Sequence, residues 1–232
     1  MKKTLSLLLA VLMMLAVLVA CDTTTPSTGD STTEAPTTTE APTTTEEQTT
    51  EAELAKDDIS KGSREGNVYK NEFLGFEFTK PDSWVFSTDE EIAAAMNLAV
   101  DQILGDNFKE ALKKNPAIYD MMVVDSITRS NINVVYENLQ LSFSSNITEA
   151  QYIEAVKYQL SNMSGMEVTF SETLEKVNLG KTEFTKCVCE TKTNGVSMTQ
   201  VFYLRNIDGY MACVIVTIAS GYTVADIEAM FK

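Results

Sequence analysis

The sequence FTKCVCETKTNGVSMTQVFYLRNIDGYMACVIVTIA, residues 184–219, decides the fold class of this chain. It contains three runs rich in β-branched and aromatic residues, separated by Asn194-Gly195 and Asp208-Gly209. Asn-Gly and Asp-Gly between apolar runs favour tight hairpin turns, because these residues adopt positive φ at low cost. The runs show no helical periodicity, so the stretch predicts a meander of antiparallel strands at 184–191, 198–205 and 210–219.

Further strands are expected on the N-terminal side of this meander. Residues 74–79 alternate bulky apolar side chains with small or polar ones, which is typical of a half-buried strand. Extended structure is also expected at 68–69, 84–86 and 168–174, and we expect 119–126 to pair with 132–143. The core residues predicted in that second strand are Val134, Tyr136, Leu139 and Leu141.

Four helices are expected between the strands. Capping boxes predict three of their first turns, because a Ser, Thr or Asn three residues before Glu or Gln can exchange side-chain to backbone hydrogen bonds with it. The pairs are Thr88 with Glu91, Asn107 with Glu110, and Thr148 with Gln151. The first helix is predicted to carry Ile92, Met96, Ala99 and Ile103 on one stripe, and Thr223 to cap a fourth helix. A mostly antiparallel sheet flanked by helices is an α+β fold, here an α/β/α sandwich.

The first twenty residues predict export. Met1-Lys2-Lys3 precedes an almost unbroken apolar run over 5–20, the pattern of a secretory signal peptide at 1–20. As a helix at ~1.5 Å per residue this run spans about 24 Å, which is short for a bilayer core of ~30 Å. An uncleaved membrane anchor is the alternative, and either interpretation places the residues after Cys21 outside the cytoplasm.

The end of this run, Leu18-Val19-Ala20-Cys21, resembles the lipobox of bacterial lipoproteins. The resemblance implies that a diacylglyceryl group is attached to the Cys21 thiol and that the chain is cleaved before this residue. Such a cysteine carries two acyl chains, which suffice for stable anchoring where one gives only marginal binding. The expected location is therefore the extracytoplasmic face of the cell membrane, with a lipid anchor on Cys21.

A change of composition divides the rest of the chain. Residues 21–66 are rich in Thr, Pro and Glu, and the sequence EAPTTT at 34–39 recurs at 40–45. Such a segment buries too little apolar surface to offset its ordering entropy, so we predict a disordered linker. The remaining stretch, 67–232, has a normal length for one α+β domain with its own core.

The charge of the chain argues against one class of partner. Its formal net charge is −15, and loss of residues 1–20 removes Lys2 and Lys3 and no acid, which gives −17. Nucleic-acid binding depends on a basic surface, so nucleic acid is not an expected partner. Anionic headgroups would also repel the chain, and the lipid on Cys21 must then hold it at the membrane.

Residues 69–84, YKNEFLGFEFTKPDSW, resemble the opening of Mog1/PsbP-like domains. Those domains begin with an aromatic residue, an asparagine, a Gly-Phe strand and a Pro-x-Gly-Trp corner, where this chain has Ser83 in place of glycine. The order of elements also fits the family across 67–232. The resemblance implies a Mog1/PsbP-like sandwich and a non-catalytic binding role, since family members in photosystem assembly and GTPase regulation act as binding partners.

Several catalytic mechanisms are incompatible with the sequence. The chain contains no histidine, which removes Ser–His and Cys–His nucleophile pairs and the common histidine-bearing zinc sites. It also has neither a G-x-S-x-G elbow nor a phosphate-binding G-x-x-x-x-G-K-[ST] loop. A pair of catalytic carboxylates stays possible, but no two acids stand out. We expect no enzyme, no catalytic residue and no cofactor.

The cysteines at 187, 189 and 213 could be read as metal ligands, because Cys-x-Cys on a strand directs both thiols to one face. If the two hairpins form, the strand 198–205 lies between Cys187 or Cys189 and Cys213. Two strand spacings of ~4.8 Å exceed the ~7 Å limit for the Cα atoms of a disulfide. We therefore expect three reduced, buried cysteines and no metal site.

Two other groups of residues have an alternative reading. Asn206 and Asp208 could belong to a calcium loop, but the further spaced acids of that motif are missing, so a plain hairpin turn is preferred. Trp84, Phe76 and Phe78 could line a ligand cleft, but aromatic residues at strand spacing usually belong to the core.

These observations favour a membrane-anchored, extracytoplasmic lipoprotein of the cell envelope, whose domain is a non-catalytic interaction module for an envelope protein or polymer. A lipoprotein that captures a small solute or metal is the first alternative. An envelope enzyme that uses carboxylates alone is the second. The sequence does not name the partner or the surface that binds it.

Overall fold

The computed structural model describes residue 55, residues 58–142 and residues 146–232. The predicted signal peptide, the lipobox with Cys21 and most of the predicted linker lie outside the described residues. Among the described residues, no helix is long and apolar enough to cross a membrane.

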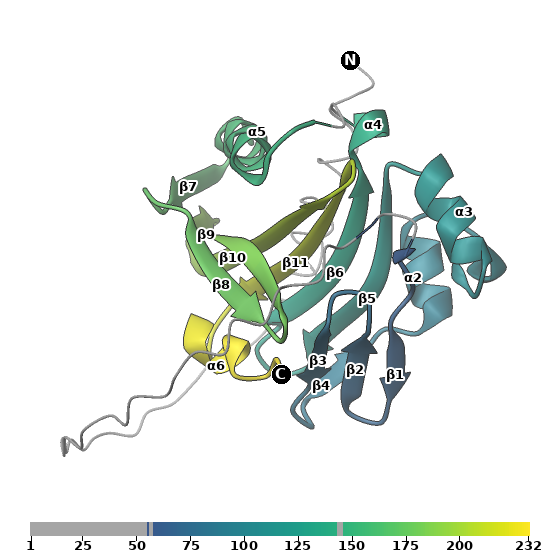
Figure 1. Ribbon diagram of the computed structural model, residues 1–232. Coiled ribbons are helices and arrows are strands. Elements are labelled where there is room, and N and C mark those ends of the chain that lie inside the picture. The colour runs from purple at the N-terminus through teal and green to yellow at the C-terminus, as the bar shows by residue number, and fades with distance from the viewer. Residues whose placement is uncertain (1–54, 56–57, 143–145) are drawn as a thin grey trace, which may run out of the picture.

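The domain is built around an eight-stranded sheet in which every pairing is antiparallel. The strand order is β4-β5-β6-β11-β10-β9-β7, and β8 pairs with the other end of β9 (Figure 1). The strands are β4 (Trp84–Phe86), β5 (Ala117–Asp125), β6 (Asn131–Asn138), β7 (Met166–Phe170), β8 (Glu175–Leu179), β9 (Thr182–Thr193), β10 (Val196–Ile207) and β11 (Tyr210–Ile218).

The meander β9-β10-β11 at the centre confirms the prediction from the two hairpin signals. Asn194 has φ 53° and Asp208 has φ 48°, and the glycine after each also has positive φ. Two consecutive residues with positive φ match the twist of the flanking strands in a tight hairpin. In the resulting register Phe202 of β10 lies opposite Cys187 of β9 and Ile215 of β11.

A second sheet has three short antiparallel strands, β1 (Ser63–Glu65), β2 (Val68–Asn71) and β3 (Phe76–Thr79). An isolated bridge between Phe78 and Phe231 joins β3 to the C-terminal segment. β1 and the buried residue Ile59, which is 1% exposed, both lie before residue 67, within the segment 21–66 that was predicted as a linker.

The helices are α2 (Asp89–Ala95), α3 (Asn107–Lys114), α4 (Leu139–Ser142), α5 (Glu149–Ser161), α6 (Val224–Glu228) and the 3₁₀ helix η2 (Val100–Ile103). One face of the large sheet packs against the small sheet, α3 and α6, and the other face packs against α2, η2 and α5. The sheet therefore lies between two covering layers, which confirms the predicted α+β class (Figure 1). A three-stranded sheet within one of these layers was not predicted.

Three of the four predicted helix caps are present. The side chains of Thr88, Thr148 and Thr223 each accept a hydrogen bond from the backbone N–H three residues later. The prediction for Asn107 is wrong, because the structure has Asp106 as the N-cap without a side-chain bond and Asn107 as the first helical residue.

Two predicted elements are shorter than their sequence patterns suggested. The stripe from Ile92 to Ile103 does not form one helix, since α2 ends at Ala95 and Asn97 adopts φ 57° before η2 begins. The predicted strand 132–143 ends at Asn138, and the next residues form α4 with Leu141 exposed rather than buried. Both errors arise from apolar residues that fit a helix and a strand about equally well.

Candidate functional site

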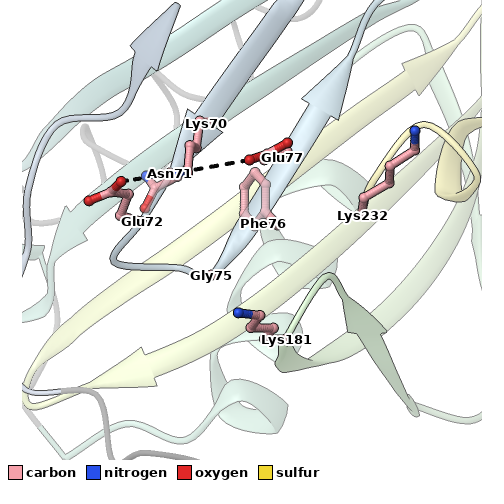
Figure 2. A pocket seen from close by; sticks show the side chains of 8 residues that line it. All are labelled: Lys70, Asn71, Glu72, Gly75, Phe76, Glu77, Lys181 and Lys232. Atoms are coloured by element: carbon pink, nitrogen blue, oxygen red, sulfur yellow. Dashed lines mark ion pairs between the residues drawn. The ribbon is translucent and has the colours of Figure 1, made fainter.

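A pocket of about 420 Å³ opens where the β2–β3 hairpin, the β8–β9 turn and the C-terminal segment meet (Figure 2). The residues that line it are Lys70, Asn71, Glu72, Gly75, Phe76, Glu77, Lys181 and Lys232. Its volume lies within the range of small-ligand sites, roughly 300–1,000 Å³. Phe76 is the only large apolar residue of this lining, so the pocket suits a polar or charged group.

Backbone hydrogen bonds hold the three segments of the pocket together. Glu77 N donates to Lys232 O, and Lys232 N donates to Glu77 O, both at 2.9 Å. Lys181 N donates to Gly75 O at 3.0 Å. The side chains of Glu77, Lys181 and Lys232 are thus positioned by mutual backbone contacts between segments that are far apart in the sequence.

Gly180 allows this close approach. A Cβ at this position would lie 2.5 Å from Gly75 O, 2.7 Å from Lys232 O and 2.7 Å from Phe76 Cβ, so no other residue fits without a shift of the backbone. Gly180 also has φ 61°, in the left-handed region that favours glycine.

The charges of the pocket fall into two groups. The ammonium group of Lys70 forms ion pairs with Glu72 at 3.2 Å and with Glu77 at 3.8 Å, drawn as dashed lines in Figure 2. No hydrogen bond or ion pair joins the side chain of Lys181 or Lys232 to another described residue. Both residues are exposed, and Figure 2 shows their side chains extending in different directions, so each ammonium group is accessible to an acidic group of a partner.

Below the pocket, Asn71 connects the hairpin to a buried polar network. Its Oδ1 accepts a hydrogen bond from Leu74 N at 2.7 Å, which closes the hairpin turn. Its Nδ2 lies 2.9 Å from Asp120 Oδ2 and 3.0 Å from each of the hydroxyls of Tyr69 and Tyr136. Asn71 thus joins the pocket lining to a carboxylate at the centre of the domain.

Asp120, on β5, is buried with a dense set of donors. Tyr69 donates to its Oδ2 at 2.6 Å, Gly62 N lies 3.0 Å from both oxygens, and Lys61 Nζ lies 3.7 Å from Oδ1. Burial raises the pKa of Asp120, although Lys61 and the hydrogen bonds from Tyr69, Gly62 and Asn71 each lower it. This network connects the small sheet to the large one.

A second buried carboxyl, Glu137 on β6, lies on the other face of the large sheet. Burial raises the pKa of Glu137 to about 7, and the hydroxyl of Tyr152 on α5 lowers it only in part. Asp120 contacts the small-sheet side through Tyr69, whereas Glu137 faces the side covered by α5. The two carboxyls with raised pKa are consequently separated by the sheet and do not form a pair.

The residues singled out in the sequence do not come together at the pocket. Cys187, Cys189 and Cys213 are free and buried, with β10 between their strands, which confirms the predicted reduced state. Among the residues that the structure describes, no group of three or more His, Cys, Asp or Glu could hold a metal ion. Cys21, the predicted lipidation site, lies outside this part of the chain.

The remaining candidates have structural roles. Asp208 lies in the β10–β11 hairpin turn, as the preferred reading predicted. Phe78 and Trp84 are fully buried core residues, and Trp84 Nε1 donates to the Tyr222 hydroxyl at 2.9 Å. Phe76 belongs to the core too, but it also lines the pocket.

No sequence pattern indicated the pocket or the burial of Glu137. The pocket lysines at 70, 181 and 232 are far apart in the chain and resemble ordinary surface lysines until the fold brings them together. Glu137 follows Tyr136 in an alternating strand, where a charged residue is expected to face solvent. Only the position of α5 shows that its side of the sheet is covered.

A scan against protein-family models finds no family that matches this chain, and a search of curated proteins finds no similar protein. Among solved structures, LpqN, described as involved in cell envelope biogenesis of Mycobacterium tuberculosis, matches 68% of this chain and 82% of its own chain. The match has 13% sequence identity and a TM-score of 0.37.

Proposed function

We propose that this chain is a lipoprotein held on the extracytoplasmic face of the cell membrane by diacylglyceryl-Cys21. Its domain is a non-catalytic module that binds an envelope protein or polymer bearing acidic groups. The anchor rests on the Leu18-Val19-Ala20-Cys21 sequence behind a signal-peptide pattern. The Mog1/PsbP-like resemblance of 69–84 supports a binding role and stays a prediction.

One observation carries the binding role. Lys181 and Lys232 both line the pocket, and the ammonium group of neither pairs with another described residue. Glu72 and Glu77 also line the pocket but pair with Lys70, which leaves Lys181 and Lys232 as unpaired cations at its rim in a chain with a formal net charge of −15. A carboxylate or phosphate group of a partner would find charge-assisted hydrogen bonds there, which are stronger than bonds between neutral groups.

The arrangement of the buried carboxyls supports a module without catalysis. A carboxylate enzyme would place two acids of different pKa side by side in a cleft. Here Asp120 and Glu137 are each about 1% exposed and face opposite sides of the sheet. Neither lines the pocket.

Cross-linking in intact cells tests this function. The lipidated protein is compared with Cys21→Ala and with the double variant Lys181→Glu, Lys232→Glu. A matched control reverses two charges outside the pocket, Lys113→Glu with Lys114→Glu on α3. We expect a specific envelope partner that is retained by the α3 control and lost in both other variants. Equal capture by the pocket variant would contradict the binding site.

Capture of a small acidic solute is a second candidate, favoured by the pocket volume of about 420 Å³. Calorimetric titration of the purified chain with small dicarboxylates and phosphate distinguishes solute capture from the interaction module. Saturable heat that disappears in the Lys181→Glu, Lys232→Glu variant would favour solute capture. A cross-linked macromolecule without such heat would favour the interaction module.

A further inference from the structure

Glu137 is a buried carboxyl with a single polar neighbour in the covering layer, the hydroxyl of Tyr152 on α5. It is 1% exposed, and no other described residue donates a hydrogen bond to its oxygens. In the sheet it lies between Ala117 of β5 and Met211 of β11, neither of which can donate to it from its side chain. A buried carboxyl with so few donors costs free energy when it ionises, so such a group invites a functional explanation.

The titratable groups that face Glu137 come from three elements: Tyr119 from β5, Cys213 from β11 and Tyr152 from α5. The hydroxyl of Tyr119 is buried without a hydrogen-bond partner among the described residues. No cation affects the pKa of Glu137 among the described residues, and the buried residues of α2 and η2 are the apolar Ile92, Ala93 and Ile103.

A negative charge at this place is unfavourable, because no opposite charge compensates its loss of hydration. The neutral carboxyl avoids most of that cost, in agreement with the raised pKa of about 7 for Glu137. Contact with water would lower the free energy of a carboxylate formed here. Water can reach it only if one of the covering elements moves.

Helix α5 is the covering element that contacts Glu137 directly. Its Tyr152 reaches Glu137, and its apolar residues Ile153, Val156 and Leu160 pack in the same cluster. Its closest neighbours in the sheet are β7, a short strand at the edge, and β10, whereas the β-strands on either side of Glu137 are fixed by long ladders.

We propose that Glu137 is a proton-controlled switch that keeps α5 seated on the sheet while the carboxyl is neutral and releases it when the carboxyl ionises. Loss of the proton places a negative charge under the helix with only the Tyr152 hydroxyl to stabilise it, and outward movement of α5 hydrates that charge. The device makes the helix-covered face of the domain responsive to the pH outside the cell, and it is independent of the lysine pocket.

Linkage fixes the size and the sign of the effect. The pKa of Glu137 is about 7 with α5 seated and returns to its ordinary value of 4.5 when the carboxyl is hydrated. The open form therefore binds protons less tightly, and opening becomes more favourable as pH rises. Between pH 6 and pH 8 the opening constant increases about tenfold, and it levels off above pH 8.

Alkylation of Cys213 reports the opening, since this thiol is buried beside Tyr152 and Glu137. The full chain is treated with iodoacetamide at several pH values, and trypsin then releases Cys213 on a different peptide from Cys187 and Cys189. The alkylation rate of Cys213 at each pH is divided by its rate in the denatured chain at the same pH. This ratio removes the effect of thiol ionisation. We expect the corrected rate for Cys213 to rise about tenfold from pH 6 to pH 8.

Two Glu→Gln variants decide the origin of that rise. Glu137→Gln should give a corrected rate independent of pH, because the amide cannot ionise. Glu154→Gln, on the exposed side of α5, should behave as the unmodified chain does. The same rise in Glu137→Gln, or no alkylation of Cys213 at pH 8 in the unmodified chain, would overturn the proposal.

A measurement on the unmodified chain covers the case in which Glu137→Gln does not fold. The ¹³C shift of the Glu137 carboxyl, followed by NMR from pH 4 to pH 9, reports its ionisation directly. A midpoint near 7, accompanied by shifts of α5 amide signals, is the expected result. A midpoint near the ordinary value of 4.5 would overturn the proposal.

Discussion

The hydroxyl of Tyr69 donates a hydrogen bond of 2.6 Å to Oδ2 of Asp120, and both residues are buried. Tyr69 lies on β2 of the small sheet and Asp120 on β5 of the large one, so this bond joins the two sheets. Asn71, two residues further along β2, reaches the same carboxylate from the pocket side.

Tyr69→Phe removes this bond and leaves a buried carboxyl oxygen with one donor fewer. We expect the free energy of unfolding to fall by about 1–3 kcal/mol, the usual cost of an unsatisfied buried group. Chemical denaturation measures it. Tyr158→Phe is the control, since Tyr158 is 73% exposed and its loss should change stability by less than about 0.5 kcal/mol. Equal values for the two variants would contradict a role of Tyr69 in joining the sheets.

Gly180→Ala tests the convergence of segments that forms the pocket. The added methyl group would clash with Gly75 O and Lys232 O, and the residue would also be strained at φ 61°. Gly195→Ala has comparable backbone strain at φ 83°, but open space around its Cβ. We expect Gly180→Ala to cost about 1–3 kcal/mol more than Gly195→Ala in thermal or chemical unfolding. A smaller cost for Gly180→Ala would show that the segments do not approach as described.

The sequence predicted the central meander and three of four helix caps because local chemistry decides them. Asn194-Gly195 and Thr148 with Gln151 each need only neighbouring residues to form their structures. The pocket depends on Gly75, Gly180 and Lys232, which meet only after the chain has folded. Glu137 is a similar case, since its burial depends on a helix that begins at Glu149.

The end of the first predicted helix has a local explanation that the sequence pattern concealed. The apolar spacing from Ile92 through Met96 to Ile103 continues past Asn97, and no glycine or proline interrupts it before Gly105. Asn97 nevertheless takes φ 57°, a conformation that asparagine accepts more readily than most residues. Periodicity alone could not separate this arrangement from one long helix.

Glu137 should make global stability depend on pH. Its pKa is about 7 in the folded chain and 4.5 as its ordinary value, so the folded state binds the proton more tightly. The contribution of Glu137 to stability is therefore full below pH 4.5, falls between pH 4.5 and pH 7, and stays constant above. Across this range the free energy of unfolding falls by about 3 kcal/mol through Glu137 alone.

The comparison of Glu137→Gln with the unmodified chain isolates this contribution, because Asp120 and the other acids titrate in both. The difference in unfolding free energy, measured in urea at pH 5 and pH 8, should shift in favour of Glu137→Gln at the higher pH. A difference that does not change with pH would show that the carboxyl is already ionised in the folded protein at pH 5.

The three thiols of the domain should be unreactive in the native protein. Cys187, Cys189 and Cys213 are at most 1% exposed, and burial raises the pKa of Cys189 to about 12. A disulfide reagent at pH 6 should therefore detect almost no domain thiol before denaturation and three after it. Fewer than three thiols in the denatured chain would indicate a disulfide that contradicts the free cysteines of the structure.

Attachment of lipid at Cys21 is the most direct test of the central claim, that this domain is displayed outside the cell on a membrane anchor. Cells expressing the full chain are fed an alkyne-tagged fatty acid, and the membrane fraction is analysed by mass spectrometry. We predict a chain that begins at Cys21 and carries the tag, and that is absent from membranes of cells expressing Cys21→Ala. An untagged chain that retains residues 1–20, or equal membrane retention of Cys21→Ala, would contradict the account.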